Sequence, residues 1–299
     1  VLAVLLQWKK PLHDFVARIG ESDITAIMQF VLVSLVILPV APNRVMGPYA
    51  VLNPFKIWLL VVLIVGISLS GYIGYKFLGG RAGLLLGGVL GGLISSTATT
   101  VSCARQSRAA TGSAAGAALV VMLASAVVFG RVLVLIGVVA GRQIGVLAGP
   151  VLAMMLVCGI LAATVWWRTR GETGTMAAHG NPAQLGPAIL FGALYAAVLL
   201  LVAAAKDHFG DAGLYAVAAL SGLTDMDAIT LSTAQYVEEG RLTATDGWRA
   251  ILVAAMSNLV FKGGIVALLG TRRMLAWVAA LFGAAFVAGA LILAFWPDR

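Results

Sequence analysis

Apolar segments of bilayer-spanning length recur along almost the whole chain, and they constrain its fold more than any other feature. A helix needs about 20 predominantly apolar residues to cross a membrane. Because lipid offers no partner for open backbone groups, such segments cross as α-helices. The segments are 24–40, 55–78, 83–103, 112–140, 145–167, 186–205, 212–236, 247–269 and 274–295. The sequence therefore predicts an all-α, polytopic integral membrane protein with about nine transmembrane helices.

Composition supports this class and excludes others. The 299 residues are 61% hydrophobic and 11% charged, whereas soluble domains are about 25% charged. The Lys and Arg residues behind the net charge of +8 lie mostly in short loops, where such residues anchor helix ends at anionic lipid. We therefore expect membrane lipid as a partner and no nucleic acid.

Cysteine usage and motifs argue against a metal-dependent or hydrolytic enzyme. Cys103 and Cys158 both lie in apolar segments, and the chain contains no CxxC or HExxH pattern. A disulfide framework or a structural zinc site is therefore not expected. Because no nucleophile–base constellation stands out either, we expect neither a cofactor nor enzymatic activity.

Two polar stretches match each other at an offset of 130 residues. GGLISSTATTVSCAR at 91–105 aligns with SGLTDMDAITLSTAQ at 221–235. A further match at the same offset precedes them, KFLGGRAGL at 76–84 and KDHFGDAGL at 206–214. Several matches in register predict an internal duplication.

The predicted unit of duplication contains four helices. Repeat one covers 56–170, repeat two covers 186–296, and 24–55 adds an extra helix and loop in front. If every helix crosses the bilayer, both copies point the same way. An inverted arrangement requires one re-entrant helix per copy, and 83–103 and 212–236 are the candidates because their second halves are polar. The Lys and Arg residues are evenly divided between the two sides, so they do not set the orientation.

The first 23 residues differ from the rest of the chain. Residues 1–8 are apolar but too short to span a bilayer, and 9–23 are charged and amphipathic. We expect 1–23 to be the tail of a preceding membrane domain plus an interfacial linker. Residues 24–299 are expected to form a single membrane domain.

Carboxylates within 212–236 predict a functional site. An ionised carboxylate at the centre of a membrane helix costs about 2.5–3.5 kcal/mol on insertion scales, so Asp225 and Asp227 need a partner or a purpose. They point about 200° apart on a regular helix. Both can face one ligand only if the helix unwinds near Gly222, as the discontinuous helices of secondary transporters do. In repeat one, Ser95 and Thr97 occupy the two corresponding positions.

One hypothesis is therefore a site for a hard cation, which takes mixed oxygen ligands. Asp225 and Asp227 would be the metal ligands or the proton carriers, and Arg131 and Lys262 would balance the charge of the empty site. The predicted ion-binding residues are Asp225, Asp227, Ser95, Thr97, Thr99, Thr230 and Asn258.

Other roles for these residues remain open. Asp225 or Asp227 can form an intramembrane ion pair with Arg131 or Lys262. The hydroxyls between 95 and 102 can bond their own helix carbonyls and join helices. Arg131 and Lys262 can also bind an anion or a lipid phosphate.

Three functions follow from these alternatives. The first is a secondary transporter or channel-like permease for an ion, with a divalent cation such as Mg²⁺ favoured. The second is a transporter of an anionic or phospholipid-type substrate. The third is a non-transporting scaffold or regulatory protein, which could form a homo-oligomer through glycine-rich helix faces such as 83–92.

The motifs together resemble one membrane family. LNPFKIWLLVVLIVGISLSGY at 52–72, followed by the polar stretches at 91–108 and 221–235, resembles the C-terminal domain, of unassigned function, that follows an MgtC/SapB-type N-terminal domain. The resemblance covers residues 10–295. It implies a multi-pass protein of the bacterial inner membrane, with residues 1–8 as the tail of the N-terminal domain. The magnesium association of the MgtC name belongs to that N-terminal domain.

Overall fold

The computed structural model describes residues 21–78, 83–108, 113–169 and 185–297, which are helical apart from their connections and one isolated β-bridge. The expected linker at 1–23 therefore lies almost wholly outside the described residues. In chain order the elements are α2 (Glu21–Val31), η1 (Leu32–Ile37), α3 (Leu38–Val40), η2 (Pro48–Ala50), α4 (Pro54–Leu78), α5 (Leu84–Arg108), α6 (Ala114–Val139), η3 (Gly141–Gln143), α7 (Ile144–Arg168), α8 (Leu185–Thr224), α9 (Met226–Glu238), α10 (Ala244–Leu269) and α11 (Arg272–Phe295).

Six helices in the described part of the chain are long and apolar enough to cross a membrane: Leu84–Arg108, Ala114–Val139, Gly141–Arg168, Ile189–Gly210, Ala244–Leu269 and Arg272–Phe295. The prediction of an all-α, multi-pass membrane protein is therefore confirmed. Three further predicted crossings correspond to shorter apolar helices, Ile27–Val40, Pro54–Ser70 and Ala212–Leu223. Nine full crossings are not confirmed.

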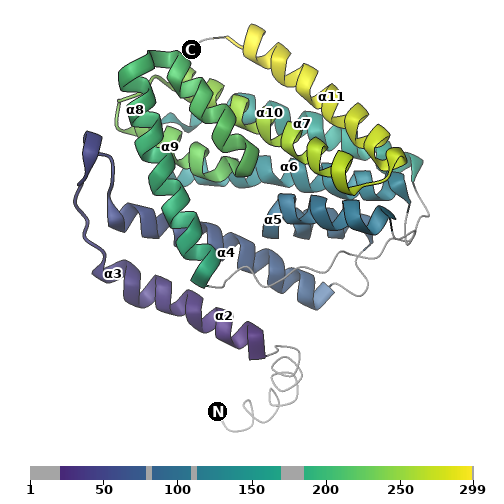
Figure 1. The fold of residues 1–299 in the computed structure, drawn as a ribbon, viewed down its shortest axis with the longest axis horizontal. Helices are drawn as coiled ribbons and strands as arrows, with labels where there is room; N and C mark the ends of the chain where they lie inside the picture. The colour runs from purple at the N-terminus through teal and green to yellow at the C-terminus, as the bar shows by residue number, and fades with distance from the viewer. Residues whose placement is uncertain (1–20, 79–82, 109–112, 170–184, 298–299) are drawn as a thin grey trace.

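The helices α6, α7, α10 and α11 pack against one another as a bundle, with α11 along the outer edge in Figure 1. Their apolar faces bury Leu119, Met154 and Trp248 completely. Small residues bring the helices close together. A Cβ at Gly289 of α11, for example, would lie 3.0 Å from the sulfur of Met256 in α10.

The bundle has two ends that serve as a reference for the other helices. We call the first end the one where α6 and α11 begin and α10 ends, on the right of Figure 1. At the second end, α6 and α11 finish and α10 begins.

Helix α5 is broken at Ser95, whose backbone is extended (φ −169°, ψ 109°). Before the break it runs alongside α6, where a Cβ at Gly88 would lie 2.5 Å from Cβ of Leu123. After the break it folds back on itself, because a Cβ at Gly91 would lie 2.6 Å from Oγ1 of Thr99. Residues eight apart on a straight helix are separated by about 12 Å.

Both ends of α5 therefore lie at the first end of the bundle. The guanidinium of Arg108 donates to the carbonyl oxygens of Leu268 at 2.8 Å and Gly270 at 3.2 Å, where α10 finishes. The amide of Thr271 donates to Oγ of Ser107 at 3.1 Å. In Figure 1, α5 accordingly extends along only part of the length of α6. We call α5 the first hairpin.

The last part of α8 runs in the same way along α10. The chain turns at Gly210, which has a positive φ of 60°. Tyr215 then donates its hydroxyl to Oδ1 of Asp246 at 3.2 Å, at the beginning of α10. Further along, a Cβ at Gly222 would lie 2.2 Å from the carbonyl oxygen of Ala254. This segment therefore enters the bundle from the second end.

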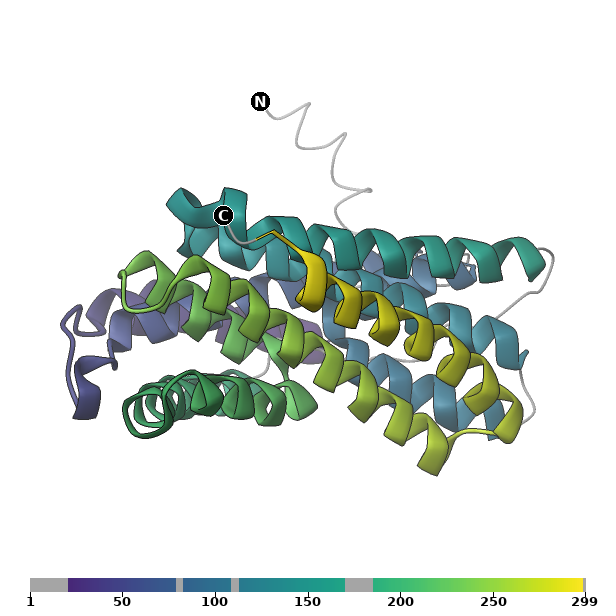
Figure 2. The same cartoon turned by 90° about the horizontal axis from the view of Figure 1, so that it is seen from above.

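A second break at Asp225 (φ −154°, ψ 128°) separates α8 from α9. Helix α9 returns to the second end, where Glu238 forms an ion pair with Arg142 at 2.5 Å and Glu239 forms one with Lys56 at 3.0 Å. We call Ala212–Thr224 together with α9 the second hairpin. Figure 2 shows the first hairpin (blue) and the second (green) at opposite ends.

The segments 83–103 and 212–236 are therefore not single continuous helices. Each is broken at one extended residue, Ser95 or Asp225, and a break near Gly222 is one of the alternatives that the sequence left open. Hydropathy did not reveal the breaks, because one extended residue leaves the composition unchanged. The 25-residue α5 still qualifies as a crossing by length and composition.

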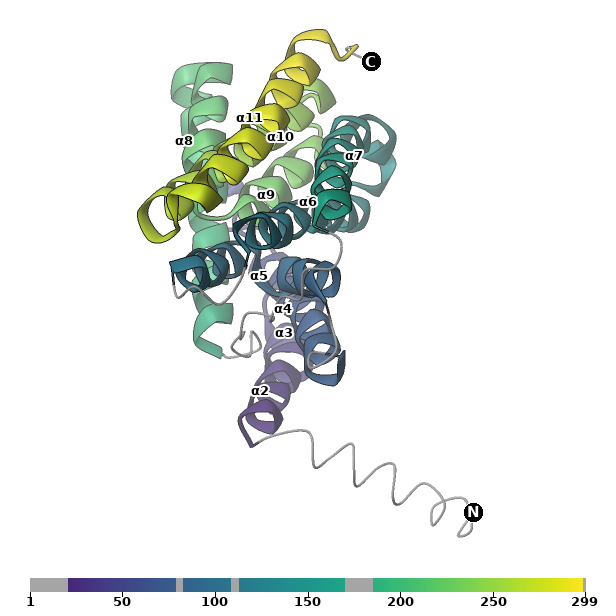
Figure 3. The ribbon, with the colours of Figure 1, turned by 90° about the vertical axis from the view of Figure 1, so that its right-hand side faces the viewer.

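The helices before the first hairpin lie at one edge of the molecule (Figure 3). A small separate core of Val33 with Val61, Val65 and Leu69 joins η1 to α4. The connection to α4 contains two non-glycine residues with positive φ, Tyr49 and Ala50.

The close approach of the second hairpin to α10 gives a stability prediction. Gly222→Ala would place a methyl group 2.2 Å from a backbone oxygen, so the helices must separate and the midpoint of thermal unfolding in detergent should fall by several degrees. Gly264→Ala in α10 is the matched control, because its Cβ would meet open space. Equal midpoints for the two variants would contradict this packing.

Candidate functional site

The tips of the two hairpins have the same local structure. Ser95 and Asp225 are both extended, and they are 130 residues apart. Each caps the helix that follows, as Ser95 Oγ accepts from the amide of Ala98 at 3.2 Å and Asp225 Oδ1 accepts from the amide of Asp227 at 2.8 Å. Serine and aspartate are preferred caps, because their side chains satisfy amides that have no partner within the helix.

The breaks also leave carbonyl oxygens without partners inside their own helices. Side chains from the neighbouring helices donate to them. Asn258 of α10 donates from Nδ2 to the carbonyl oxygen of Gly222 at 2.9 Å. Arg131 of α6 donates to the carbonyl oxygen of Leu93 at 3.5 Å, a longer contact. Asn258 therefore lies at the second hairpin tip, where its side chain satisfies a carbonyl oxygen at the end of α8.

Arg131 also forms a buried ion pair with Asp227, and we call this contact the tip ion pair. The distance from its NH2 to Oδ2 of Asp227 is 2.6 Å, and the two side chains are 8% and 1% exposed. One guanidinium therefore contacts the tips of both hairpins, through Leu93 in the first and Asp227 in the second. This is the pairing that the sequence left open as an alternative to a free carboxylate.

In the first half of α9, next to the tip ion pair, three buried oxygen atoms have neither a hydrogen bond nor an ion pair among the described residues. They are Oδ1 of Asp227 and Oγ1 of Thr230 and of Thr233. Positions three residues apart follow one side of a helix. The second hairpin therefore presents a short row of unpartnered oxygens that starts at the tip ion pair. The predicted site included Thr230 but not Thr233, although the same spacing could have suggested it.

Lys262 of α10 is buried without a carboxylate partner. Its side chain is 1% exposed, and its hydrogen bond to Ser125 Oγ of α6 measures 3.3 Å. Among the ion pairs of the described residues none includes Lys262. The two basic residues expected to balance charge therefore differ, because Arg131 is paired and Lys262 is not.

Two threonine hydroxyls of the first hairpin form hydrogen bonds within their own helix. Thr99 donates to the carbonyl oxygen of Ser95, and Thr100 to that of Ser96, each at 2.8 Å. Thr97 lies half-buried beyond the break. Of the predicted binding residues, the structure brings Asp227, Asp225 and Asn258 to the second tip, and leaves Thr99 bonded locally.

The carboxylates alone do not form a multidentate metal centre. No group of three or more His, Cys, Asp or Glu residues suitable for a metal occurs in the described ranges. A cation at the second tip would have to combine Asp225 or Asp227 with neutral oxygens. The metal-ligand role of these two residues stays a prediction.

The far end of α9 is fixed by a separate polar network. Besides the ion pairs of Glu238 and Glu239, Gln235 donates to Glu239 Oε1 at 2.9 Å and accepts from the hydroxyl of Tyr195 at 2.8 Å. Helix α9 is buried from Met226 to Val237 and is therefore held by polar contacts at both of its ends.

These features define a multi-pass, all-helical membrane protein with two opposed helical hairpins and a charged contact at their tips. The chain belongs to the family described as "Domain of unknown function (DUF4010)", whose model matches residues 62–270. An uncharacterized protein of Aquifex aeolicus (strain VF5) is 31% identical over 198 residues, which cover 65% of this chain and 86% of the relative. No solved structure matches. Neither match is described as MgtC/SapB, so that association stays a prediction.

The tip ion pair gives a second stability prediction. Asp227→Asn leaves Arg131 buried without a counter-charge, and breaking a buried pair typically costs about 3–5 kcal/mol. We expect a large fall in the midpoint of thermal unfolding. Removing both charges, with Arg131→Met and Asp227→Leu, should restore much of it.

Glu238→Gln is the matched control, because its partner Arg142 is 78% exposed and such pairs contribute about 1 kcal/mol or less. If Asp227→Asn were as stable as Glu238→Gln, the tip ion pair would not stabilise the fold.

Proposed function

We propose that the protein is a secondary transporter or channel-like permease for an ion, not an enzyme, and that its substrate binds at the hairpin tips. The observation that carries this proposal is the pair of opposed re-entrant hairpins whose tips contact one buried guanidinium. Irregular backbone at membrane depth is tolerated only where it is buried in protein or lines a cavity. Discontinuous helices in inverted repeats are the usual way in which secondary transporters build a site near the bilayer midplane.

We further propose that 56–170 and 186–296 are inverted copies of one unit. The matched positions support this. Gly92 packs against Ala124, and Gly222 packs against Ala254. The two residues of the second contact each lie 130 positions after their counterparts in the first contact. We also propose the bacterial inner membrane as the location, in line with the resemblance of the motifs.

A cation is the first candidate substrate. The unpartnered oxygens of Asp227, Thr230 and Thr233 are ligands suited to a hard cation or a proton carrier. A cation bound at Asp227 must compete with Arg131, so loading would release Arg131 from the second hairpin. Replacement of Arg131 by the cation would therefore link cation binding to a loss of the contact between Arg131 and the second hairpin tip. A divalent cation such as Mg²⁺ fits this role, with Asp225 as the further carboxylate.

Flux measurements in reconstituted vesicles test the cation proposal. Asp225→Asn and Asp227→Asn should each lower the initial rate of Mg²⁺ entry by at least about tenfold, which corresponds to about 1.4 kcal/mol. Thr230→Val should lower it as well while keeping the charges intact. Thr100→Val is the matched control, because that hydroxyl already bonds to its own helix. Unchanged flux in both Asp variants, with internal pH also unaffected, would exclude the proposal.

An anion is the second candidate substrate, and Lys262 is the observation that favours it. A buried ammonium without a carboxylate is costly, and a bound anion would supply the missing charge. In this case Lys262 and Arg131 would bind an anionic or phospholipid-type substrate, and the Asp residues would carry protons.

Lys262→Met separates the two candidates. It should abolish the uptake of small anions such as phosphate into vesicles and leave Mg²⁺ entry unchanged if an anion is the substrate. Lys206→Met is the matched control, because Lys206 lies at the second end, where its Nζ donates to the carbonyl oxygen of Arg241 at 3.1 Å. Equal anion uptake in both variants would exclude the second candidate. Vesicles that move neither ion would support the third function, a scaffold.

A further inference from the structure

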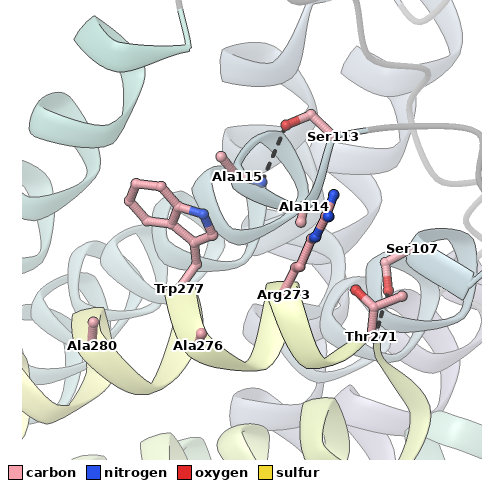
Figure 4. Close-up of a pocket in the computed structure, with 9 residues that line it drawn as sticks. All are labelled: Ser107, Ser113, Ala114, Ala115, Thr271, Arg273, Ala276, Trp277 and Ala280. Atoms are coloured by element: carbon pink, nitrogen blue, oxygen red, sulfur yellow. Dashed lines mark hydrogen bonds between the residues drawn. The ribbon is translucent and has the colours of Figure 1, made fainter.

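A groove at the first end of the bundle is separate from the hairpin tips. It lies between the beginnings of α6 and α11 and encloses about 740 Å³ (Figure 4). Its polar side chains are Ser107, Ser113, Thr271 and Arg273, and Trp277 with nearby alanines forms the rest of the wall. Because three membrane helices begin or end here, the groove lies at the depth where lipid headgroups meet a membrane protein.

Arg273 has a guanidinium that the fold does not use. The side chain is exposed and makes no hydrogen bond or ion pair within the described residues. Its neighbour Arg108 differs, because both of its contacts are to the carbonyl oxygens at the end of α10. In Figure 4, Arg273 extends toward Ala114, at the start of α6.

The other polar groups of the groove can also donate. Ser113 uses its Oγ to accept from the amides of Ala115 and Gly116, and Thr271 accepts from the amide of Met274, so both hydroxyl hydrogens are left to donate outward. The indole of Trp277 is half-buried beside them. The groove therefore combines a planar cation, hydroxyl donors and an aromatic ring in a wall that contains no carboxylate among its lining residues.

We propose that this groove binds the headgroup of an anionic phospholipid from the surrounding leaflet. Arg273 forms the bidentate contact with the phosphate that guanidinium groups favour. Ser113 and Thr271 donate to the remaining phosphate oxygens, and Trp277 packs at the headgroup level, where Trp is enriched in membrane proteins. The methyl groups of Ala276 and Ala280 leave space along α11 for the start of an acyl chain.

The positive charge around the groove favours an anionic phospholipid as its ligand. Arg272 and Arg273 both lie at the start of α11, and Arg105 and Arg108 lie at the end of α5, so this end is strongly basic. An anionic leaflet attracts such a cluster by about 1 kcal/mol per basic residue near the surface. The half-apolar wall adds a preference for a lipid over free inorganic phosphate, because phosphate has no apolar part to bury.

Native mass spectrometry of the delipidated protein, titrated with phosphatidylglycerol, tests the proposal. Arg273→Ala should weaken binding by about tenfold, as expected for the loss of one charge-assisted contact. Arg272→Ala is the matched control, because it removes an adjacent exposed arginine that does not line the groove. Ala276→Trp fills the groove without changing its charge and should weaken binding as strongly as Arg273→Ala.

Each outcome decides the question. Equal losses for Arg272→Ala and Arg273→Ala would mean a diffuse surface charge effect and would overturn the proposal. Full binding by Ala276→Trp would place the lipid elsewhere. Phosphatidylcholine binding as tightly as phosphatidylglycerol would overturn the preference for an anionic lipid, and inorganic phosphate competing at equal concentration would identify a free phosphate site instead. The midpoint of thermal unfolding is measured for all three variants as a control. Midpoints equal to that of the unsubstituted protein show that weaker lipid binding does not result from unfolding.

Discussion

The contact of one guanidinium with both hairpin tips is the interaction on which the rest of the structure depends. Two breaks in the middle of an apolar bundle expose backbone groups that lipid cannot satisfy. Arg131 meets one end carbonyl, at Leu93, and carries the charge that balances Asp227. Asn258 meets the other end carbonyl, at Gly222. Without these donors, the carbonyl oxygens at the two breaks would be buried without a hydrogen-bond partner. A continuous helix would then be the more stable state of each segment.

The sequence revealed the class of the protein more readily than the paths of its helices. Apolar length predicted an all-helical membrane protein, and the offset of 130 residues aligned Ser95 with Asp225, the two positions at which the helices break. The breaks themselves could not be predicted from periodicity, because a single extended residue alters neither composition nor spacing. The pairing of Asp227 with Arg131 was foreseeable as one of four combinations, and only the packing of α6 against α9 selects it.

The chemistry of the tips is less symmetric than their backbone. The first hairpin is capped by a serine and the second by an aspartate, so the carboxylates at the tips occur in the second hairpin alone. Helix α9 is accordingly the charged element, held by a buried pair at its tip and by exposed pairs at its other end. Exposed pairs contribute little. The buried contact is therefore the one that contributes most to the position of α9, and in the proposed cation transporter it is the contact with which an ion would exchange.

The central claim is that the two hairpins enter the membrane from opposite sides. Single cysteines in a background without Cys103 and Cys158 test it, with a membrane-impermeant maleimide applied to sealed vesicles of known orientation. Cysteines at Gly83 and Arg105 lie near the two ends of the first hairpin, and cysteines at Ala212 and Glu239 lie near the two ends of the second. The account predicts that the first two react from one side and the last two from the other. Reaction of Gly83 and Arg105 positions from different sides would show that α5 crosses the membrane, and would contradict the account.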